Sequence, residues 1–351
     1  MTCYRIAAAE CGLVSSMLRR VGQRIGAATA AAAFVAVAAA TAAVAATHAP
    51  AAGAQTWPSK PVRFVVNFPP GGPLDLAARA VAERVSAAVN QPVVVENRPG
   101  AAGNIGADAV ARAAADGYTV LFTIDTPFTV NPAIYSKLPF RLEDFRPLSL
   151  IGSSGLMFAV HPSLGVKTLE AFIAKAKAQE VTFSSAGNGS PGHLASAILA
   201  EHTGAKVVHV PYKGNAPAVA ALVGGEVQAA IIATPGLLPH VQAGKLHALA
   251  VTSRQRSPIA TDVPTGAEAG LPPLEFEVQY LALAPRGVPD DVADALQKAI
   301  TAAVASDEVR QRLLRLDLHP SGEIGAAVEQ RMVQLRQRYE PVIRKIELKV
   351  E

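Results

Sequence analysis

Residues 62–75, with the sequence VRFVVNFPPGGPLD, constrain the fold of this chain more than any other stretch. The first part is mostly apolar and rich in β-branched side chains, which predicts a buried strand. A Pro/Gly loop at 68–73 ends the strand, and an apolar helical pattern follows. Such a junction leaves unpaired backbone N–H groups facing one place, where the helix dipole adds partial positive charge. Because the loop has no nucleophile, metal ligand or basic side chain, it is suited to holding a carboxylate rather than transforming it.

A second junction of the same kind lies at 182–202, where a strand enters a helix through the Gly/Pro loop 186–192. The alternation of strands and helices along the chain favours an α/β fold with mostly parallel sheets flanked by helices. Sites on open α/β sheets lie outside the carboxyl ends of the strands. Two such junctions therefore predict two lobes that face a shared cleft.

The strands are predicted at 62–67, 93–96, 119–123, 156–160, 182–184, 207–210, 229–232, 248–252 and 280–284. The helices are predicted at 73–89, 106–114, 168–178, 191–202, 217–223, 237–243, 290–304, 307–315 and 323–340. The last helix carries an apolar stripe at helical spacing, which indicates core packing, and Pro341 is expected to break or kink it.

The N-terminal 54 residues have the features of a cleaved export signal. An arginine cluster precedes the uncharged, Ala/Val-rich run 25–46, and a small-x-small cleavage site precedes Gln55. The alternative is a membrane anchor, because the run is about long enough to span a bilayer. Met17 is an alternative start, since the basic cluster follows it directly. The expected location is the periplasm.

The composition of the remaining chain excludes some classes of function. Residues 1–54 hold four of the 32 basic and one of the 28 acidic side chains, which leaves 28 basic and 27 acidic side chains. This balance shows no nucleic-acid footprint. Both cysteines, Cys3 and Cys11, lie in the predicted signal, so the mature chain suits an oxidising compartment without a disulfide.

Residues 187–192 match the dinucleotide pattern G-x-G-x-x-G, but the next strand ends in Pro-Tyr-Lys-Gly instead of an acidic residue. The histidines show no metal-ligand spacing, so neither a metal nor a cofactor is expected. The rival function is a periplasmic α/β hydrolase that uses a loop serine, Ser190 or Ser185. No motif places a base beside either serine, which favours a receptor over an enzyme.

The chain resembles the Bug-type solute-binding receptors of tripartite tricarboxylate transporters. The matching segments follow the family order: 57–61 (WPSKP), 68–75 (FPPGGPLD), 96–106 (ENRPG and GNIG), 115–120 (ADGYTV), 131–132 (NP), 209–214 (HVPYKG), 224–227 (GGEV), 244–252 (GKL and LAVT), 263–265 (VPT) and 268–272 (EAGLP). Two residues depart from the pattern: Asn67 replaces a usual proline, and Leu74 replaces a small polar residue.

The resemblance implies a periplasmic binding protein of the type II-like fold, with lobe 1 at 55–159 plus 281–351 and lobe 2 at 160–280. The chain is expected to cross between the lobes near 158–161 and 280–285. A small carboxylate-bearing ligand would be held in the cleft mainly through backbone amides and water, and delivered to the membrane subunits of a tripartite transporter. A monomer is expected.

The expected ligand-binding residues lie on the loops around the cleft: Phe68, Pro70, Gly71, Gly72, Asp75, Asp125, Thr126, Ser185, Ala186, Gly187, Asn188, His193, Tyr212 and Lys213. Some of them have a structural alternative. His193 either donates to the ligand or packs in its loop, and Lys213 either binds the ligand or anchors the loop. Arg98, which is close by, is expected to pin its loop rather than to bind a carboxylate.

Asp125 follows a predicted strand end at the rim of the cleft. It either caps the next segment or faces the ligand. A carboxylate facing the ligand would repel a second ligand carboxylate, because an unpaired buried charge is costly. This alternative favours a monocarboxylate or zwitterion over citrate-like ligands.

Overall fold

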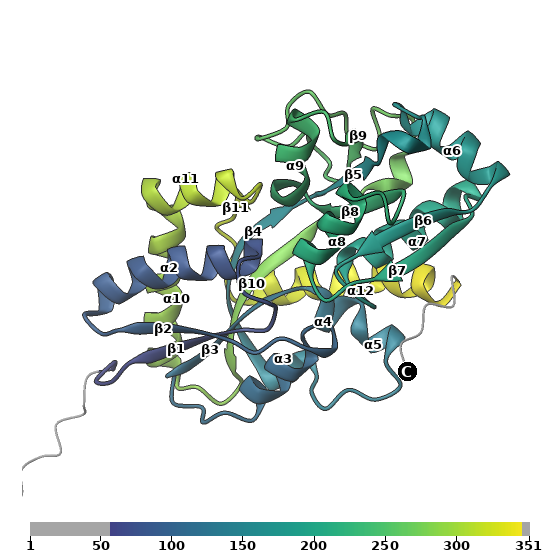
Figure 1. Ribbon diagram of the computed structural model, residues 1–351. Coiled ribbons are helices and arrows are strands. Elements are labelled where there is room, and N and C mark those ends of the chain that lie inside the picture. Colours follow the sequence, from purple (N-terminus) through teal and green to yellow (C-terminus); the bar gives the residue numbers. More distant parts are fainter. Residues whose placement is uncertain (1–56, 346–351) are drawn as a thin grey trace, which may run out of the picture. The chain divides into compact units, whose positions relative to one another are not determined.

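The computed structural model describes residues 57–345, which contain two β-sheets with helices packed on them (Figure 1). The predicted export signal lies outside the described residues. Within the described part, no helix is both long and apolar enough to cross a membrane.

The first sheet has six strands. In order across the sheet they are β11 (His319–Pro320), β4 (Phe145–Ser154), β10 (Val278–Pro285), β3 (Thr119–Ile124), β1 (Val62–Val66) and β2 (Val93–Asn97). β2, β1 and β3 run parallel, with Val62 opposite Val93 and Phe64 opposite Val120. β10 and β11 pair in antiparallel fashion with their neighbours.

The second sheet has five strands in the order β7 (Val207–Pro211), β6 (Val181–Ser185), β8 (Ala229–Ala233), β5 (Leu156–Val160) and β9 (His247–Val251). β7, β6 and β8 run parallel, whereas β5 is antiparallel to both of its neighbours. The two-lobed α/β prediction is confirmed, but the sheets are mixed rather than mostly parallel. The trios β2-β1-β3 and β7-β6-β8 share one strand order, which is the structural repeat that the two junctions predict.

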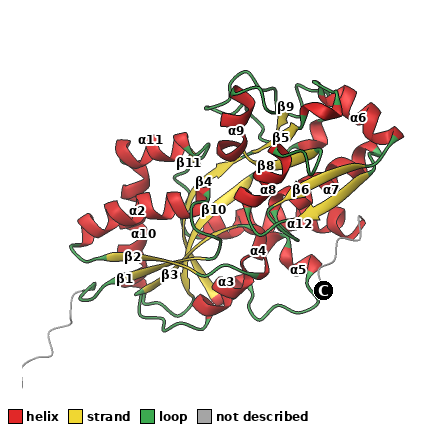
Figure 2. Cartoon of the chain, in the orientation of Figure 1, coloured by secondary structure: helices red, strands yellow, loops and turns green. Residues whose placement is uncertain are grey.

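The helices cover both faces of each sheet (Figures 1 and 2). The α-helices are α2 (Pro73–Val89), α3 (Asn104–Ala111), α4 (Thr126–Thr129), α5 (Asn131–Ile134), α6 (Leu169–Ala178), α7 (Pro191–Thr203), α8 (Asn215–Val223), α9 (Thr234–Gln242), α10 (Asp290–Ala305), α11 (Asp307–Arg315) and α12 (Ala326–Lys345). Short 3-10 turns lie at η1 (Ala101–Gly103), η2 (Leu142–Asp144), η3 (Pro162–Leu164) and η4 (Pro272–Leu274). α12 continues through Pro341 to Lys345, so this proline does not end the helix.

The chain passes between the sheets earlier than the sequence predicts. β4 lies in the first sheet and β5 in the second, so the first passage is at Gly155 rather than at 158–161. The return passage precedes Val278, because all of β10 belongs to the first sheet. β4 escaped prediction because Pro147 and its serine-rich end hide the strand pattern. The proline is tolerated since β4 lies next to the edge, and β11 pairs only with Gly152 and Ser153.

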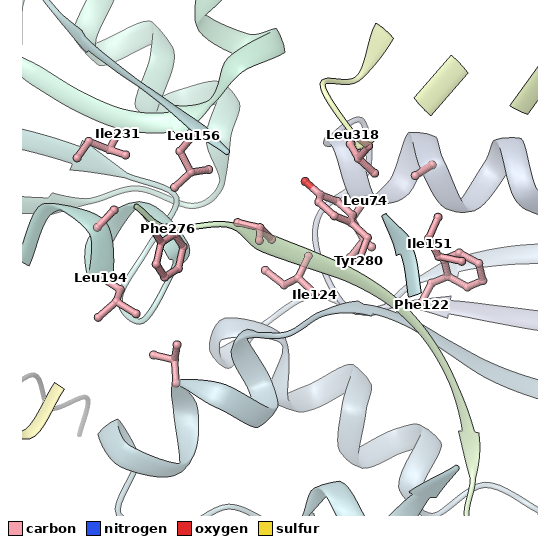
Figure 3. Packing of buried hydrophobic residues seen from close by; sticks show 14 of the residues in the cluster. Leu74, Phe122, Ile124, Ile151, Leu156, Leu194, Ile231, Phe276, Tyr280 and Leu318 are labelled. Carbon is pink, nitrogen blue, oxygen red and sulfur yellow. The ribbon is translucent and has the colours of Figure 1, made fainter. Parts of the chain in front are cut away.

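Side chains alternate between the two faces of each strand, so apolar residues pack in a core on each face of the sheet. On β1, Phe64 and Val66 pack on the side of α2, whereas Val65 joins a second cluster with α3 and α12. The larger cluster continues from one sheet to the other. Figure 3 shows β10 running through it, with Phe276 beside Leu194. This continuous core fixes the base from which the site loops extend.

Candidate functional site

The loops of interest follow the strands at which the connections change direction. In the first sheet the chain goes from β1 outward to β2 and then back across to β3. β6, β7 and β8 repeat this path in the second sheet. Ligands of open α/β sheets bind at such points, because successive helices part to opposite faces there. The loops after β1, β3, β6 and β8 therefore form the candidate site.

The loop after β1 is held in shape by Asp75. Its carboxylate accepts hydrogen bonds from the Gly71 amide (2.9 Å) and the Asn97 side-chain amide (2.9 Å), and it pairs with Arg79. Burial acts to raise the pKa of Asp75, but the hydrogen bonds from Arg79, Gly71 and Asn97 hold it below its usual value. Because these partners all belong to the chain, Asp75 positions the loop, and a direct contact with a ligand stays a prediction.

α2 begins beside this loop with free amide groups. Gly71 has φ 80°, a left-handed conformation that favours glycine, and the N-cap Gly72 is extended and provides no side-chain cap. Among residues 57–345, no hydrogen-bond acceptor meets the amides of Gly72, Leu74 or Asp75. Phe68 is half-buried, and Pro70 is exposed. The amides and the helix dipole together can hold an anion.

The glycine loop after β2 packs against the end of β1. A Cβ on Gly106 would lie 2.6 Å from the Asn67 Cβ and 2.8 Å from the Arg98 carbonyl oxygen, so only glycine fits. Asn67 donates to the Gly103 carbonyl (3.0 Å), which gives this departure from the family pattern a role in tying two loops together. Arg98 pairs with Glu96 (2.5 Å), in keeping with the expected pinning role.

In the second lobe, a serine and two histidines shape the loop after β6. The Ser185 Oγ accepts from the Gly187 amide (3.2 Å) and lies 2.6 Å from the His209 Nε2. The His193 Nδ1 accepts from the Gly189 amide (3.1 Å). The two imidazole rings are stacked with centroids 3.6 Å apart and planes 7° from parallel. Sequence reasoning missed His209 here, although its place two residues before the end of β7 is a usable signal.

Both histidines of this stack are neutral at neutral pH. Burial, followed by the nearby His209, lowers the pKa of His193 to about 3, and burial lowers the pKa of His209 to about 4. The His193 Nδ1 is an acceptor, so a neutral ring carries its proton on Nε2. The stack therefore brings no positive charge to the site, and donation from the His193 Nε2 to a ligand stays a prediction.

The loops of the two lobes come close to one another. A Cβ on Gly189 would lie 2.6 Å from the Ile134 Cδ1 and 3.6 Å from the Asn131 Oδ1, both of the first lobe. A Cβ on Gly214 of the second lobe would lie 3.6 Å from the Pro69 Cγ. Segments that follow the strands of one lobe thus lie close to segments that follow the strands of the other lobe.

Three buried side-chain oxygens in the segments that follow β1 and β3 lack a partner among residues 57–345: the Asn67 Oδ1, the Thr126 Oγ1 and the Asn131 Oδ1. All three residues follow the ends of β1 or β3. A buried polar atom without a hydrogen bond costs free energy, which a ligand or an ordered water removes. Asn131 was noted in the sequence only as part of a matching motif, and its unsatisfied oxygen could not be inferred from that motif.

Asp125 does not cap the segment that follows it, and a contact of Asp125 with a ligand stays a prediction. Its carboxylate accepts from the Gln279 amide (3.0 Å) and the Thr129 hydroxyl (2.9 Å), and it makes no side-chain cap. Burial raises the pKa of Asp125 to about 6, although the hydrogen bonds from Gln279 and Thr129 act to lower it. The group joins β10 to α4, so repulsion of a second ligand carboxylate has no support in this geometry.

The remaining predicted residues line the rim of the second lobe. The Tyr212 amide donates to the Ser185 carbonyl (3.0 Å), which ties the segment after β7 to the loop after β6. The Ala186 carbonyl accepts from the Gly214 amide (3.2 Å) in the same arrangement. Asn188 and Lys213 are exposed. These bonds hold the backbones of the two segments together, and ligand contacts by either segment stay predictions.

The pair of Ser185 and His209 has the residue types of a hydrolase but not the surroundings. Ser185 is 1% exposed, and its Oγ also bonds the Gly187 amide. No carboxylate among residues 57–345 bonds His209 to orient its ring, as a catalytic triad requires. The described residues also hold no group of three or more His, Cys, Asp or Glu side chains arranged for a metal.

Comparison with known proteins places these features in context. The family model described as "Tripartite tricarboxylate transporter family receptor" matches residues 77–348. The protein BugT of Bordetella pertussis is 40% identical over 260 residues, which cover 73% of this chain and 80% of BugT.

Two solved structures of similar proteins contain dicarboxylates. Rpa4515 of R. palustris with adipate shares 31% identity and a TM-score of 0.79, covering 84% of this chain and 99% of that one. MatC of Rhodopseudomonas palustris with bound malate shares 28% identity and a TM-score of 0.75, covering 82% and 100%. The matching family is one of transporter receptors rather than enzymes, so the choice of a receptor over a hydrolase is confirmed.

Proposed function

Because the chain belongs to the tripartite tricarboxylate transporter receptor family, we propose that it is an exported receptor for a small carboxylate. The family consists of periplasmic binding proteins that work with the membrane subunits of a transporter. In this proposal residues 1–54 are removed on export, and the mature protein acts as a monomer that delivers its ligand to those subunits.

The start of α2 carries the proposal. Free amides of Gly72, Leu74 and Asp75 converge beside a glycine with φ 80°, and the loop from Phe68 to Gly72 contains no basic side chain. An anion bound there is neutralised by backbone dipoles rather than by a counter-ion. The unsatisfied oxygens of Thr126 and Asn131 are supplied with donors by ligand hydroxyl groups or by bridging water.

The ligand class is the small organic carboxylates, of which the adipate and malate bound by relatives are examples. Since the Asp125 carboxylate is occupied by Gln279 and Thr129, the structure offers no reason to exclude dicarboxylates. The proposed ligand class therefore includes acids with more than one carboxylate, beside the monocarboxylates and zwitterions that the sequence favours.

Native mass spectrometry of the protein purified from the periplasm tests the proposal, followed by thermal-shift measurements with malate, adipate, citrate and acetate. A co-purified carboxylate, or a rise in melting temperature that saturates with one of the acids, supports it. If no carboxylate binds and a neutral sugar or a cation is found instead, the proposal is wrong.

A further inference from the structure

A cavity of about 320 Å³ lies between the interlobe passages and α12, and none of the glycine loops lines it. Its walls come from both lobes: Ser153 at the end of β4, Ser253 after β9, and Arg338 and Tyr339 on α12. Glu277 and Gln279 line it from the return passage and the first residues of β10. Its volume is in the range of small-molecule sites.

Gln279 gives the cavity an unsatisfied acceptor. The residue is 2% exposed, and its Oε1 has no hydrogen-bond partner in the described part of the chain. Its Nε2 donates a long hydrogen bond (3.5 Å) to the Glu277 carbonyl. A buried oxygen of this kind favours an occupant with an N–H or O–H donor.

The hydroxyl of Tyr339 adds a second free polar group. The residue is 3% exposed and lines the cavity, and its hydroxyl bonds none of residues 57–345. Burial raises its pKa, and the nearby acidic groups Asp125, Glu277 and Glu275 raise it further, so the phenol is neutral and able to donate.

The lining of the cavity also contains guanidinium and carboxylate groups, those of Arg254, Arg331, Arg338, Glu275 and Glu277. Arg254 and Arg338 share one acceptor oxygen of Glu275, at 3.1 and 3.3 Å, and both retain further N–H donors. Glu277 accepts only a long bond (3.4 Å) from the Arg254 amide within residues 57–345. The cavity thus offers donors suited to a carboxylate and acceptors suited to an ammonium group.

We propose that this cavity is a second ligand site, which binds a small α-amino acid in its zwitterionic form. The carboxylate faces Arg254 and Arg338, and the ammonium group faces Glu277 and the Gln279 Oε1. Because the walls belong to both lobes and to the passage between them, an occupant stabilises the arrangement of the lobes in which these walls are close. The site would therefore couple amino-acid binding to closure of the cleft.

Calorimetry on the mature protein tests the proposal with L-serine and two probes that each lack one charge, ethanolamine and 3-hydroxypropionate. We expect saturable binding of serine, and binding about tenfold weaker for each of the other probes. Gly71→Val alters the cleft loop but no residue of the cavity lining, so it retains saturable serine binding. Absence of serine binding, equal binding of either single-charge probe, or loss of binding in Gly71→Val would overturn the proposal.

Variants of cavity residues and matched control variants test whether serine binds in this cavity. Gln279→Leu and Arg338→Gln should each weaken serine binding about tenfold or more. Gln297→Leu on α10 and Arg344→Gln, farther along α12, lie outside the cavity lining and should bind as the parent does. Arg338 has a half-exposed side chain, so its replacement is not expected to prevent folding. Unchanged affinity in both cavity variants would contradict the assignment.

Discussion

Gly71 and Gly72 are neighbours in the anion-binding loop, yet alanine should affect them oppositely. Gly71 has φ 80°, and a Cβ built there meets no atom within 4 Å. The cost of Gly71→Ala is therefore conformational rather than steric. Gly72 has φ −79° and ψ 167°, and its Cβ would make an ordinary contact with the Pro69 oxygen at 3.8 Å. Gly72→Ala therefore fits without strain.

The magnitudes follow from these geometries. A side chain in the left-handed region costs about 1–2 kcal/mol. Moving Gly71 to negative φ would instead endanger its hydrogen bond to the Asp75 carboxylate, a charge-assisted bond that contributes about 1.5–3 kcal/mol. We therefore expect Gly71→Ala to lower the free energy of unfolding by about 1–2 kcal/mol. Gly72→Ala should raise it by about 0.4–1 kcal/mol, because alanine reduces the entropy of the unfolded chain.

Denaturant unfolding of both variants beside the parent measures the difference, which should be about 2 kcal/mol. Calorimetry with the carboxylate found in the ligand screen measures the second effect. Strain at Gly71 displaces the amides at the start of α2, so affinity should fall about tenfold, or ~1.4 kcal/mol. Equal stability of the two variants would refute the role of φ, and unchanged affinity in Gly71→Ala would refute the role of the loop in binding.

Three further predictions concern closure, pH and export. Ligand binding should reduce the radius of gyration of the protein in small-angle scattering. Gly189→Val should oppose this reduction, because a Cβ at this position would lie 2.6 Å from the Ile134 Cδ1. An identical scattering profile with and without ligand would argue for a rigid pocket. The pKa values of His193 and His209, about 3 and about 4, lie below the unfolded value, so their contribution to stability is full above about pH 6.5 and falls as the pH drops towards 4. Urea titrations should therefore show a free energy of unfolding that is roughly 2 kcal/mol lower at pH 5 than at pH 7, after allowance for the partial exposure of the pair. An equally steep loss in a His209→Phe variant would contradict this. N-terminal sequencing of the periplasmic protein should begin at Gln55, and an Ala-rich segment retained in the membrane fraction would contradict cleavage.

The parts of the site that were predictable are those encoded within a few neighbouring residues. Pro73 fixes the first helical residue of α2, and Gly71 supplies the left-handed backbone that the loop requires. The same local logic located the loop after β6. β4 was missed because its identity as a strand depends on pairing with β10, whose residues follow more than a hundred positions later.

The roles of the acidic residues were not predictable for the same reason. Asp125 bonds the amide of Gln279, which lies 154 residues away in the sequence, and Asp75 depends in part on Asn97 at the end of β2. A local motif shows that a carboxylate is present at a strand end but not which donors the fold brings to it. Both carboxylates accept hydrogen bonds from donors of the chain, and these bonds organise the loops of the candidate site.

Because Asp75 and Asp125 bond donors of the chain, other groups would select the ligand of such a receptor. If amides at the start of α2 hold the charge of the ligand, they recognise its anionic group and not the rest of the molecule, because backbone N–H groups are the same in every sequence. Discrimination then falls to fixed side-chain oxygens around it, of which the Thr126 Oγ1 and the Asn131 Oδ1 are the unsatisfied examples. A substitution at either position changes which donors the site accepts without disturbing anion capture. The structures of two similar proteins, one with adipate and one with malate, show that related proteins of this fold hold different dicarboxylic acids.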